Sequence, residues 1–268
     1  VYQGKGDCEG RLRTGPATEK LVESPLLTRH AAAVARVRQM LARYRKRLDP
    51  QPDSVVARAA RACPHIRRGG LSPMGLYVAD VLRRAVPGAH VALVNSGGVR
   101  GGLGKGRVTY ADVYRVFPFD NRVSYADVTG RQLRHMVAGY LGRAHSGFLL
   151  ASGIRYELRC GPPMSLVKIT DDQGKRLVDT KIYRVVLSDF LLEGGDGFGR
   201  VLKNVPAGRK KILEVLVRDV LLRALKQLKH PLNDAKHPLV SPTNPRIRVV
   251  GPPCGKVHHK RSPRPVCR

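Results

Sequence analysis

The stretch LVNSGGVRGGLGKGRVTY, residues 93–110, carries the clearest local pattern of this chain. It continues an apolar run, HVALVN (90–95), which predicts a buried strand. The remainder of the stretch holds six glycines and two arginines. A glycine-rich loop after a strand lets the backbone approach an anionic group closely. The stretch therefore predicts a strand that ends at a binding loop.

This loop does not match the phosphate-binding loops of known sequence pattern. A P-loop requires Gly-Lys followed by Ser or Thr, whereas Lys105 is followed by glycine, and no G-x-G-x-x-G register fits. Asn95 offers a donor and an acceptor, and Arg100 can form two parallel hydrogen bonds with a phosphate or a carboxylate. Gly97 and Gly98 lie between them and free the backbone. We interpret the loop as one that recognises a ligand and does not react with it.

A second glycine cluster, SDFLLEGGDGFG (188–199), also follows an apolar strand pattern. Phe190 precedes its glycines and Asp196 lies among them. An aromatic face can stack on a base, contributing about 1–3 kcal/mol, and a carboxylate can accept hydrogen bonds from ribose hydroxyls. The segment VFPFDN (116–121) supplies a second candidate ring in Phe119. The alternative interpretation places both phenylalanines in the core.

Periodicity along the rest of the chain predicts helices and strands in irregular order. The expected helices cover residues 30–48, 74–86, a short segment opened by Thr109, 133–141 and 209–229. The expected strands cover residues 90–95, 123–128, 153–159, 165–170, 175–180, 183–192 and 246–250. Because the two types mix without strict β-α-β alternation, the pattern favours an α+β (mixed α/β) domain, with a mixed sheet flanked by helices.

These motifs, in this order, resemble the C-terminal domain of the 5′-nucleotidase / UDP-sugar hydrolase family. Residues 93–137 are similar to its Asn-x-Gly-Gly-[Ile/Val]-Arg loop, Thr-led helix, Pro-Phe-[Gly/Asp]-Asn turn and Thr-Gly-x-x-Leu helix. The cluster 188–199 is similar to a second signature of the family. The segment SPMGLYVAD (72–80) is similar to a third, although both of its asparagines are replaced here. The resemblance covers residues 60–250 and implies the same fold.

The resemblance also implies a role for each matched residue. Phe119 and Phe190 would enclose a nucleobase, Asp196 would hold the ribose hydroxyls, and Asn95 would bind near the base. Two arginines would lie on the anionic side of the substrate. The implied nucleotide-binding residues are Asn95, Gly97, Gly98, Arg100, Phe119, Phe190, Asp196 and Arg68.

Catalysis in that family belongs to an N-terminal metallophosphatase domain, in which two divalent metal ions activate a water. Asp-x-His, Gly-Asn-His-[Asp/Glu] and Gly-His segments mark that domain, and none occurs in this sequence. The nine histidines lie apart or in the basic tail, away from carboxylates at dinuclear-site spacing. We therefore expect no catalytic residue, no metal ligand and no cofactor here, and no hydrolysis by this chain alone. Within a whole enzyme, the activity would be that of a 5′-nucleotidase-type phosphoric ester hydrolase.

The charge balance is strongly basic, with 49 Lys and Arg against 20 Asp and Glu and a net charge of +29. Such an excess favours a polyanionic partner, RNA or another acidic assembly surface. An arginine-rich composition without such a partner is the alternative. The candidate polyanion-binding residues are Arg43, Arg45, Lys46, Arg47, Lys256, Lys260, Arg261 and Arg264.

The cysteines give no pattern of their own. All five are scattered without a C-x-x-C pair, which predicts no disulfide framework. Cys254 and Cys267 flank His258 and His259, but the spacing matches no standard zinc pattern. No apolar run reaches the roughly 18 residues of a membrane span.

The expected organisation is an extended arm (1–28), a basic linker-type helix (29–59), the family-like domain (60–250) and a basic proline-rich tail (251–268). We expect a non-catalytic domain recruited as a structural, RNA-associated component of a large assembly, in an organelle matrix or an intracellular assembly. A nucleoside or nucleotide ligand is a further possible partner. The alternative is the nucleotide-recognition half of a secreted or periplasmic 5′-nucleotidase whose catalytic domain lies outside this chain.

Overall fold

The computed structural model describes residues 31–47, 52–66, 71–143, 147–161, 163–241, 243 and 245–252. The chain divides into two compact units, residues 1–52 and 53–268. In its described part, the first unit is the helix α3 (Ala31–Arg47), which the sequence predicted over 30–48. Its apolar side chains Val37, Met40, Leu41 and Tyr44 are all exposed.

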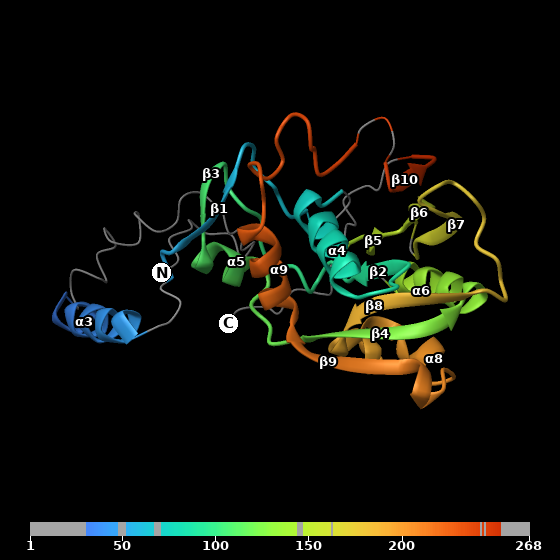
Figure 1. The fold of residues 1–268 in the computed structure, drawn as a ribbon, viewed down its shortest axis with the longest axis horizontal. Helices are drawn as coiled ribbons and strands as arrows, with labels where there is room; N and C mark the ends of the chain where they lie inside the picture. The colour runs from blue at the N-terminus through green and yellow to red at the C-terminus, as the bar shows by residue number, and fades with distance from the viewer. Residues whose placement is uncertain are drawn as a thin grey trace, which may run out of the picture. The chain divides into compact units, whose positions relative to one another are not determined.

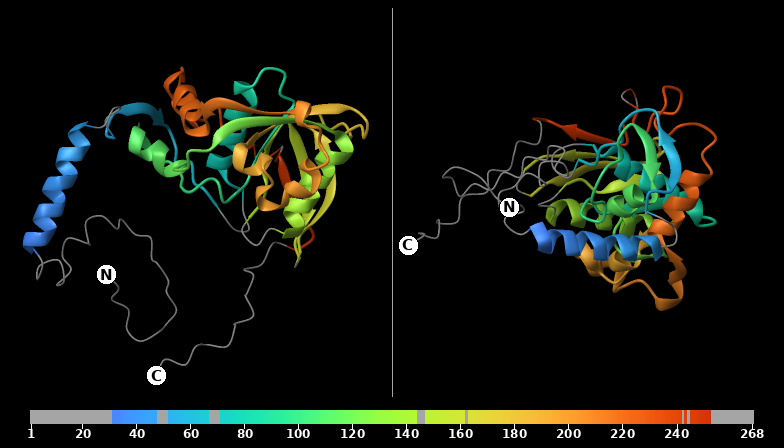
Figure 2. Two further views of the ribbon diagram at one scale, coloured as in Figure 1. Left: turned by 90° about the horizontal axis from the view of Figure 1, so that it is seen from below. Right: turned by 90° about the vertical axis from the view of Figure 1, so that its left-hand side faces the viewer.

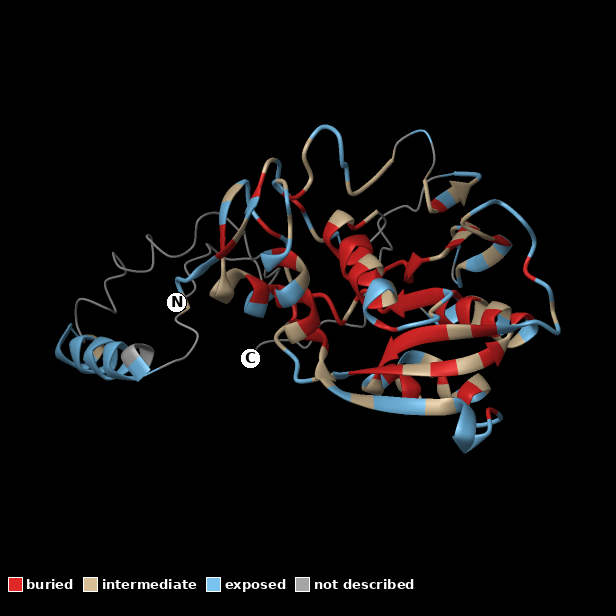
Figure 3. Ribbon diagram, in the orientation of Figure 1, coloured by how far each residue is buried: buried red, intermediate tan, exposed pale blue. Residues whose placement is uncertain are grey.

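A five-stranded mixed sheet forms the centre of the second unit (Figure 1). Its strands, in spatial order, are β5 (Leu150–Ser152), β2 (Val91–Val94), β8 (Ile182–Ser188), β4 (Arg122–Thr129) and β9 (Lys210–Leu216). The neighbours β2 and β8 run parallel, and the other neighbouring pairs run antiparallel. The central strands are mainly buried, whereas none of the residues of the edge strand β9 is buried (Figure 3).

Two smaller sheets complete the strands of the described residues. In the first, β1 (Val55–Ala59) pairs antiparallel with β3 (Gly106–Thr109). In the second, β6 (Ile154–Arg159) pairs parallel with β10 (Ile247–Val250) and antiparallel with β7 (Ser165–Asp171).

Helices pack around the central sheet. They are α4 (Pro73–Ala85), α5 (Tyr110–Val116), α6 (Gly130–Arg143), α7 (Asp189–Leu192), α8 (Gly199–Leu202) and α9 (Val217–Lys226), with the 3-10 turns η2 (Gly195–Gly197) and η3 (Ala207–Arg209). Helix α4 contacts β2 and β5, and α9 contacts α4 and α5. Helices α6, α7 and α8 lie together near β4 and β8 (Figure 2). None of the helices in the described residues is both long and apolar enough to cross a bilayer.

The helix starts follow from local side-chain chemistry, as the sequence predicted. The hydroxyl of Ser72 accepts a backbone hydrogen bond from the first turn of α4, which opens with a proline. Thr109 and Asp112 form a reciprocal capping box at α5. Thr129 and Gln132 do the same at α6, with hydrogen bonds of 2.9 and 3.2 Å. These signals need no distant contact, which is why the sequence alone reveals them.

The segment 72–80 has packing and cross-linking roles. A Cβ on Gly75 would overlap the side chain of the buried Leu150, so a larger residue there would require Leu150 to move. Asp80 accepts hydrogen bonds of 2.7 Å from both terminal nitrogens of Arg246, and one of 2.6 Å from the hydroxyl of Ser152. This carboxylate therefore joins α4 to β5 and to the segment before β10.

The expected helix over 209–229 was wrong in its first half. Residues Lys210–Leu216 form β9, which pairs with β4 through the register Ser124↔Ile212, and only Val217–Lys226 is helical. Pairing with an available sheet edge outweighs the local helical spacing of the apolar residues, because strand preference depends on cross-strand neighbours.

Three other boundaries also differ from the sequence prediction. The expected strand 175–180 forms one bridge, Arg176 to Thr170, because the carbonyls of Asp179 and Lys181 accept hydrogen bonds from the first turn of α6. The strand expected to reach residue 192 ends at Ser188, whose hydroxyl caps α7. In the segment 29–59, the helix ends at residue 47 and residues 55–59 form β1.

Two of the cysteines lie in the described residues. Cys63 is buried and free, and burial raises the pKa of its thiol to about 11. Cys160 is disulfide-bonded.

Candidate functional site

The sheet topology brings three loops to one edge of the central sheet. This is the edge at which the strands β2 and β8 end, and it differs from the side of the sheet formed by the edge strand β9. Because β2 and β8 are parallel neighbours, the chain leaves both strands at the same edge. Because β4 runs antiparallel to β8, with Val123 opposite Ser188, the turn before β4 enters at that edge too. We call residues 95–100, 117–121 and 189–197 the sheet-edge loops. Ligands of open α/β sheets commonly bind beyond the carboxyl ends of parallel strands.

Asn95 and Asp196, which come from two different loops, are in direct contact. The Nδ2 of Asn95 donates a hydrogen bond of 2.7 Å to Oδ2 of Asp196. Asn95 is buried, whereas Asp196 is exposed. Asp196 also has φ 51° and ψ 27°, a left-handed conformation that is uncommon outside glycine. Such backbone strain concentrates at binding and catalytic sites.

The loop after β2 is a tight turn built around Asn95. The N–H of Gly98 donates to the carbonyl of Asn95 at 3.0 Å, and a Cβ on Gly98 would lie 2.6 Å from Oδ1 of Asn95. Only glycine fits there, whereas a Cβ on Gly97 would make ordinary contact. The N–H of Ser96 donates to the hydroxyl of Tyr140 at 3.1 Å. The turn therefore fixes the amide side chain of Asn95 in one place.

The two candidate rings are exposed, unlike the other phenylalanines. Of the five phenylalanines of the chain, Phe117, Phe148 and Phe198 are buried, while Phe119 is 41% and Phe190 45% exposed. This exposure excludes the interpretation that places both rings in the core.

The carboxylate of Asp189 ties the two ring-bearing loops together. Its Oδ1 accepts from Nδ2 of Asn121 at 2.9 Å and from the N–H of Phe190 at 2.8 Å, and its Oδ2 accepts from the N–H of Arg122 at 3.0 Å. One side chain thereby couples the position of Phe190 to the turn that carries Phe119.

Arg218 of α9 holds the turn that carries Phe119 through hydrogen bonds. Its guanidinium donates to the carbonyl of Phe119 at 3.4 Å and to Oδ1 of Asp120 at 2.7 Å, and it stacks over the ring of Tyr114 at 4.5 Å. Burial alone would lower the pKa of Arg218, but the hydrogen bond and charge of Asp120 outweigh it and raise the pKa. The guanidinium therefore stays charged in a buried place.

Arg100 lies beside Phe119 on the exposed side of the loops. Its guanidinium carbon is 5.9 Å from the ring centroid of Phe119, and Nη1 lies 3.4 Å from the carbonyl of Gly97. Its backbone N–H donates to the carbonyl of Val116 at 2.8 Å, which fixes the residue at the turn. An exposed guanidinium with further donors to offer suits an anionic group of a ligand.

The ring of Phe190 rests against the backbone of the second glycine cluster. A Cβ on Gly195 would lie 2.4 Å from Cε1 of this ring, so a side chain there would displace Phe190. The preceding Gly194 has φ 110°, a conformation that other residues rarely adopt. The glycines of this loop therefore serve the placement of the ring.

Several predicted site residues do not belong to the sheet-edge loops or lie outside the described residues. Arg68 lies outside the described residues. Of the candidate polyanion-binding residues, Arg43 and Arg47 are exposed on α3. The side chains of Arg45 and Lys46, and the residues Lys256, Lys260, Arg261 and Arg264, lie outside the described part of the chain.

Sequence reasoning missed the residues that hold the site together. Asn121 and Asp189 stand inside the quoted motifs, so the signal was present, but the sequence does not show that they bond to each other. Arg218 was hidden in a region expected to be one long helix. Tyr140 gave no signal, because its contact with the loop arises only from the packing of α6.

Comparison with known proteins places the chain among nucleotide-processing relatives. Residues 55–204 match the family described as 5′-nucleotidase, C-terminal domain. The chain is 34% identical over 139 residues to the trifunctional nucleotide phosphoesterase of Bacillus subtilis, covering 47% of this chain and 9% of that protein. It is 34% identical over 115 residues to the 5′-nucleotidase of Vibrio cholerae, covering 42% of this chain and 20% of that protein.

A solved structure gives the same result for the fold. The 5′-nucleotidase precursor of Thermus thermophilus superposes with a TM-score of 0.66 and 27% identity, over 81% of this chain and 43% of that one. The predicted α+β class and the resemblance found in the motifs are confirmed. The chain spans less than half of that structure and 9% and 20% of the two curated relatives.

Proposed function

This chain belongs to the 5′-nucleotidase C-terminal domain family, and we propose that its sheet-edge loops recognise a nucleoside or a 5′-nucleotide. One observation carries the proposal: two exposed rings, Phe119 and Phe190, belong to loops that Asp189 ties together. Leaving two large apolar rings in water beside a rigid polar cluster is costly unless a ligand covers them. Of the two functions that the sequence left open, nucleotide recognition is the one that this geometry supports best.

Each part of a nucleotide has a chemical counterpart in the loops. Phe119 and Phe190 offer their faces to the base. The carboxylate of Asp196 accepts hydrogen bonds from the ribose hydroxyls, and Asn95 holds it by one oxygen at 2.7 Å. Arg100, beside Phe119, meets the phosphate. The proposed role of this chain is therefore binding and orientation of the nucleotide.

Hydrolysis is not part of the role proposed for this chain. Metal-assisted attack on a phosphate ester needs ligands for two metal ions. The segments that mark a metallophosphatase domain do not occur among these 268 residues. We propose that cleavage of the nucleotide, where it occurs, is the work of such a domain acting on a substrate that these loops hold.

Isothermal titration with four ligands tests the proposal. Adenosine and adenosine 5′-monophosphate should bind, and the nucleotide should bind more tightly because Arg100 adds a charged contact. Ribose 5-phosphate and inorganic phosphate should bind far more weakly, since they have no base to stack. Phe190→Ala should weaken nucleotide binding by about 1–3 kcal/mol, roughly 5- to 150-fold in Kd.

Tyr44→Ala is the matched control, because Tyr44 is an exposed aromatic residue of the first unit, outside the sheet-edge loops. It should leave the nucleotide Kd unchanged. Absence of binding at millimolar adenosine 5′-monophosphate would overturn the proposal, as would equal affinity of the wild type and Phe190→Ala.

A second candidate function rests on charge. With a net charge of +29 and exposed Arg43 and Arg47 on α3, we propose that the chain also associates with a polyanion such as RNA. Binding to a generic RNA should weaken steeply as salt rises, because phosphate contacts release counterions. A complex insensitive to salt would contradict this.

A further inference from the structure

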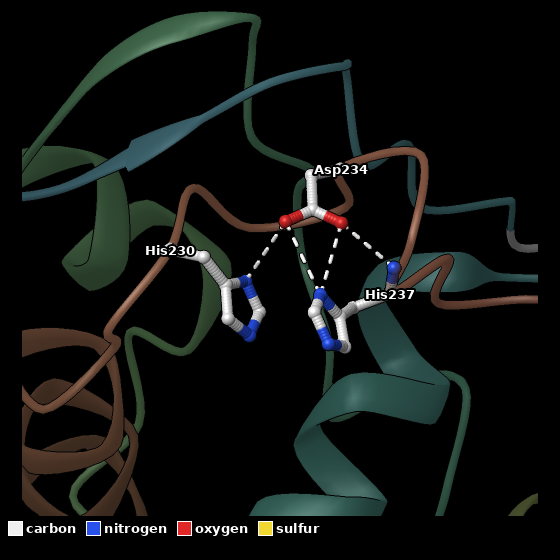
Figure 4. A group of neighbouring side chains, drawn as sticks. All are labelled: His230, Asp234 and His237. Carbon is white, nitrogen blue, oxygen red and sulfur yellow. Dashed lines mark hydrogen bonds and ion pairs between the residues drawn. The ribbon is translucent and has the colours of Figure 1, made fainter.

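Three polar side chains gather in the turn that follows α9 (Figure 4). The carboxylate of Asp234 faces the Nδ1 atoms of two imidazoles: Nδ1 of His230 is 3.1 Å from Oδ2, and Nδ1 of His237 is 3.1 Å from Oδ1. Each residue offers one candidate ligand atom, and these atoms all lie within 4.8 Å of one another. The histidines that the sequence showed as separate residues thus include two that the fold brings together beside one carboxylate. We call residues 230–237 the histidine turn.

The backbone of the histidine turn is fixed by contacts with the β1 segment. Asn233 has φ 56°, and its amide donates to the carbonyl of Ala62 at 3.0 Å and accepts from the N–H of Leu239 at 3.3 Å. The buried Leu232 donates its N–H to the carbonyl of Arg58 at 2.8 Å. The turn is thus held in one conformation before any ligand arrives, which lowers the ordering cost of binding.

Charged and polar groups around the turn fix the orientation of the carboxylate of Asp234. The guanidinium of Arg61 donates to the backbone carbonyls of Asn233 and Asp234 at 3.0 and 2.7 Å. It therefore holds the backbone of the turn. Oδ1 of Asp234 accepts the N–H groups of Lys236 and His237 at 2.9 and 2.7 Å. These bonds turn the carboxylate toward the Nδ1 atoms of both rings (Figure 4).

The geometry approaches that of a metal shell. The imidazoles of His230 and His237 are stacked, with centroids 3.9 Å apart and planes 13° apart, so they lie side by side against the carboxylate. Ligand atoms of a tetrahedral zinc ion, at bonds of about 2.0–2.1 Å, lie about 3.4 Å from one another. The two nitrogen–oxygen distances of 3.1 Å are already near this value. The rings must tilt out of their stacked arrangement for both Nδ1 atoms to point at one ion, and the exposure of His237 leaves its ring room to do so.

We propose that His230, Asp234 and His237 form a binding site for a divalent transition metal, with Zn²⁺ as the ion that the donors favour. Two imidazole nitrogens and one carboxylate suit zinc, whereas Mg²⁺ and Ca²⁺ prefer all-oxygen shells. His237 is exposed, so water has access to the fourth position. The ion would join the end of α9 to the turn that is fastened to the β1 segment.

Zinc titration of the EDTA-treated 268-residue chain tests the site. Isothermal titration should show one Zn²⁺ bound to the histidine turn, and MgCl₂ at the same concentration should give no binding. His230→Ala and His237→Ala should each weaken zinc binding by at least roughly 10- to 100-fold, the range that even outer-shell partners of metal sites show. Circular dichroism checks that each variant folds, and the exposed His237 is the safer of the two to replace.

Two controls separate this site from other histidines. His135→Ala removes an exposed histidine from α6 and should change nothing. His258→Ala/His259→Ala removes the histidine pair of the tail and should leave the zinc that depends on His237 in place. The proposal fails if the wild type binds no zinc, or if His237→Ala binds zinc as tightly as the wild type. It fails equally if zinc binding disappears only in the tail variant, because an ordinary hydrogen-bonded turn then accounts for the cluster.

Discussion

The sheet-edge loops and the histidine turn gather polar side chains in two different ways. Asn95 and Asp196 are 101 residues apart and meet only because β2 and β8 are parallel neighbours. His230 and His237 belong to one turn and meet through its local conformation and a few backbone contacts. The first site therefore depends on the whole sheet, and the second on one anchored turn. Each can be altered without the other.

The largest expected effect comes from removing both rings at once. Because each ring contributes about 1–3 kcal/mol, Phe119→Ala/Phe190→Ala should reduce nucleotide affinity below detection. Both side chains are exposed, so the stability should change little, and zinc binding at the histidine turn should not change. Calorimetric titration of the double variant with each ligand measures this. His237→Ala should weaken zinc binding and leave the nucleotide Kd unchanged. A loss of nucleotide affinity in that variant would show that the two regions are coupled.

A smaller loss of nucleotide affinity is expected when the hydrogen bonds between the two ring-bearing loops are removed and both rings are kept. Asp189→Ala leaves the amide of Asn121 and the N–H groups of Arg122 and Phe190 without their acceptor. The loss of such an acceptor should lower the free energy of unfolding by about 1–3 kcal/mol and weaken nucleotide binding. Urea unfolding and nucleotide titration are the measurements. Asp189→Asn keeps one carbonyl acceptor and should fall between; if it matches Asp189→Ala, the hydrogen-bond count is not what matters.

The histidine turn should respond to a backbone change that the sheet-edge loops do not feel. Asn233 has φ 56°, and alanine is less able than asparagine to adopt this conformation. Asn233→Ala should therefore cost about 1–2 kcal/mol of stability and weaken zinc binding, with the nucleotide Kd unchanged. Asn233→Gly relieves the strain but also loses the amide contacts. A glycine variant as weak in zinc binding as the alanine variant would assign the effect to those contacts.

The smallest expected effect is a pH-dependent change in stability at α5, the helix that precedes the turn of Phe119. Burial alone raises the pKa of Asp112, but hydrogen bonds from Thr109 and the charge of Arg115 outweigh it and hold the pKa below its usual value. Since the folded pKa is the lower one, the carboxylate stabilises the fold above the unfolded value of about 3.9. This contribution is lost as pH falls through the folded pKa. Asp112→Asn should be less stable than the wild type at pH 6, and the two urea midpoints should converge in acid. A constant difference would contradict the assignment.

The sequence predicted those parts of the fold that depend on neighbours along the chain. The caps at Ser72, Thr109 and Thr129 formed as expected, because each needs partners only three residues away. The edge strand β9 was mistaken for helix, because its conformation depends on pairing with β4, more than eighty residues earlier in the sequence. Local preference could not reveal that partner.

The candidate site likewise has a part that local motifs reveal and a part that depends on distant contacts. Recognisable motifs marked Asn95, Phe119, Phe190 and Asp196 as candidate site residues, and the structure places them in the loops at one edge of the sheet. That Asp189 ties the two ring-bearing loops, and that Arg218 supports one of them, follows only from contacts across the sheet.

The family, the α+β class and the chemistry available at the loops can be recognised in the amino-acid sequence, because they depend on residue types and short spacings. Which side chains meet depends on the folded chain. The tertiary structure exposed Phe119 and Phe190, joined Asn95 to Asp196, and gathered His230, Asp234 and His237 in one turn. The physical reason is that hydrogen bonds and coordination act over about 3 Å. Only the path of the folded backbone brings groups that close.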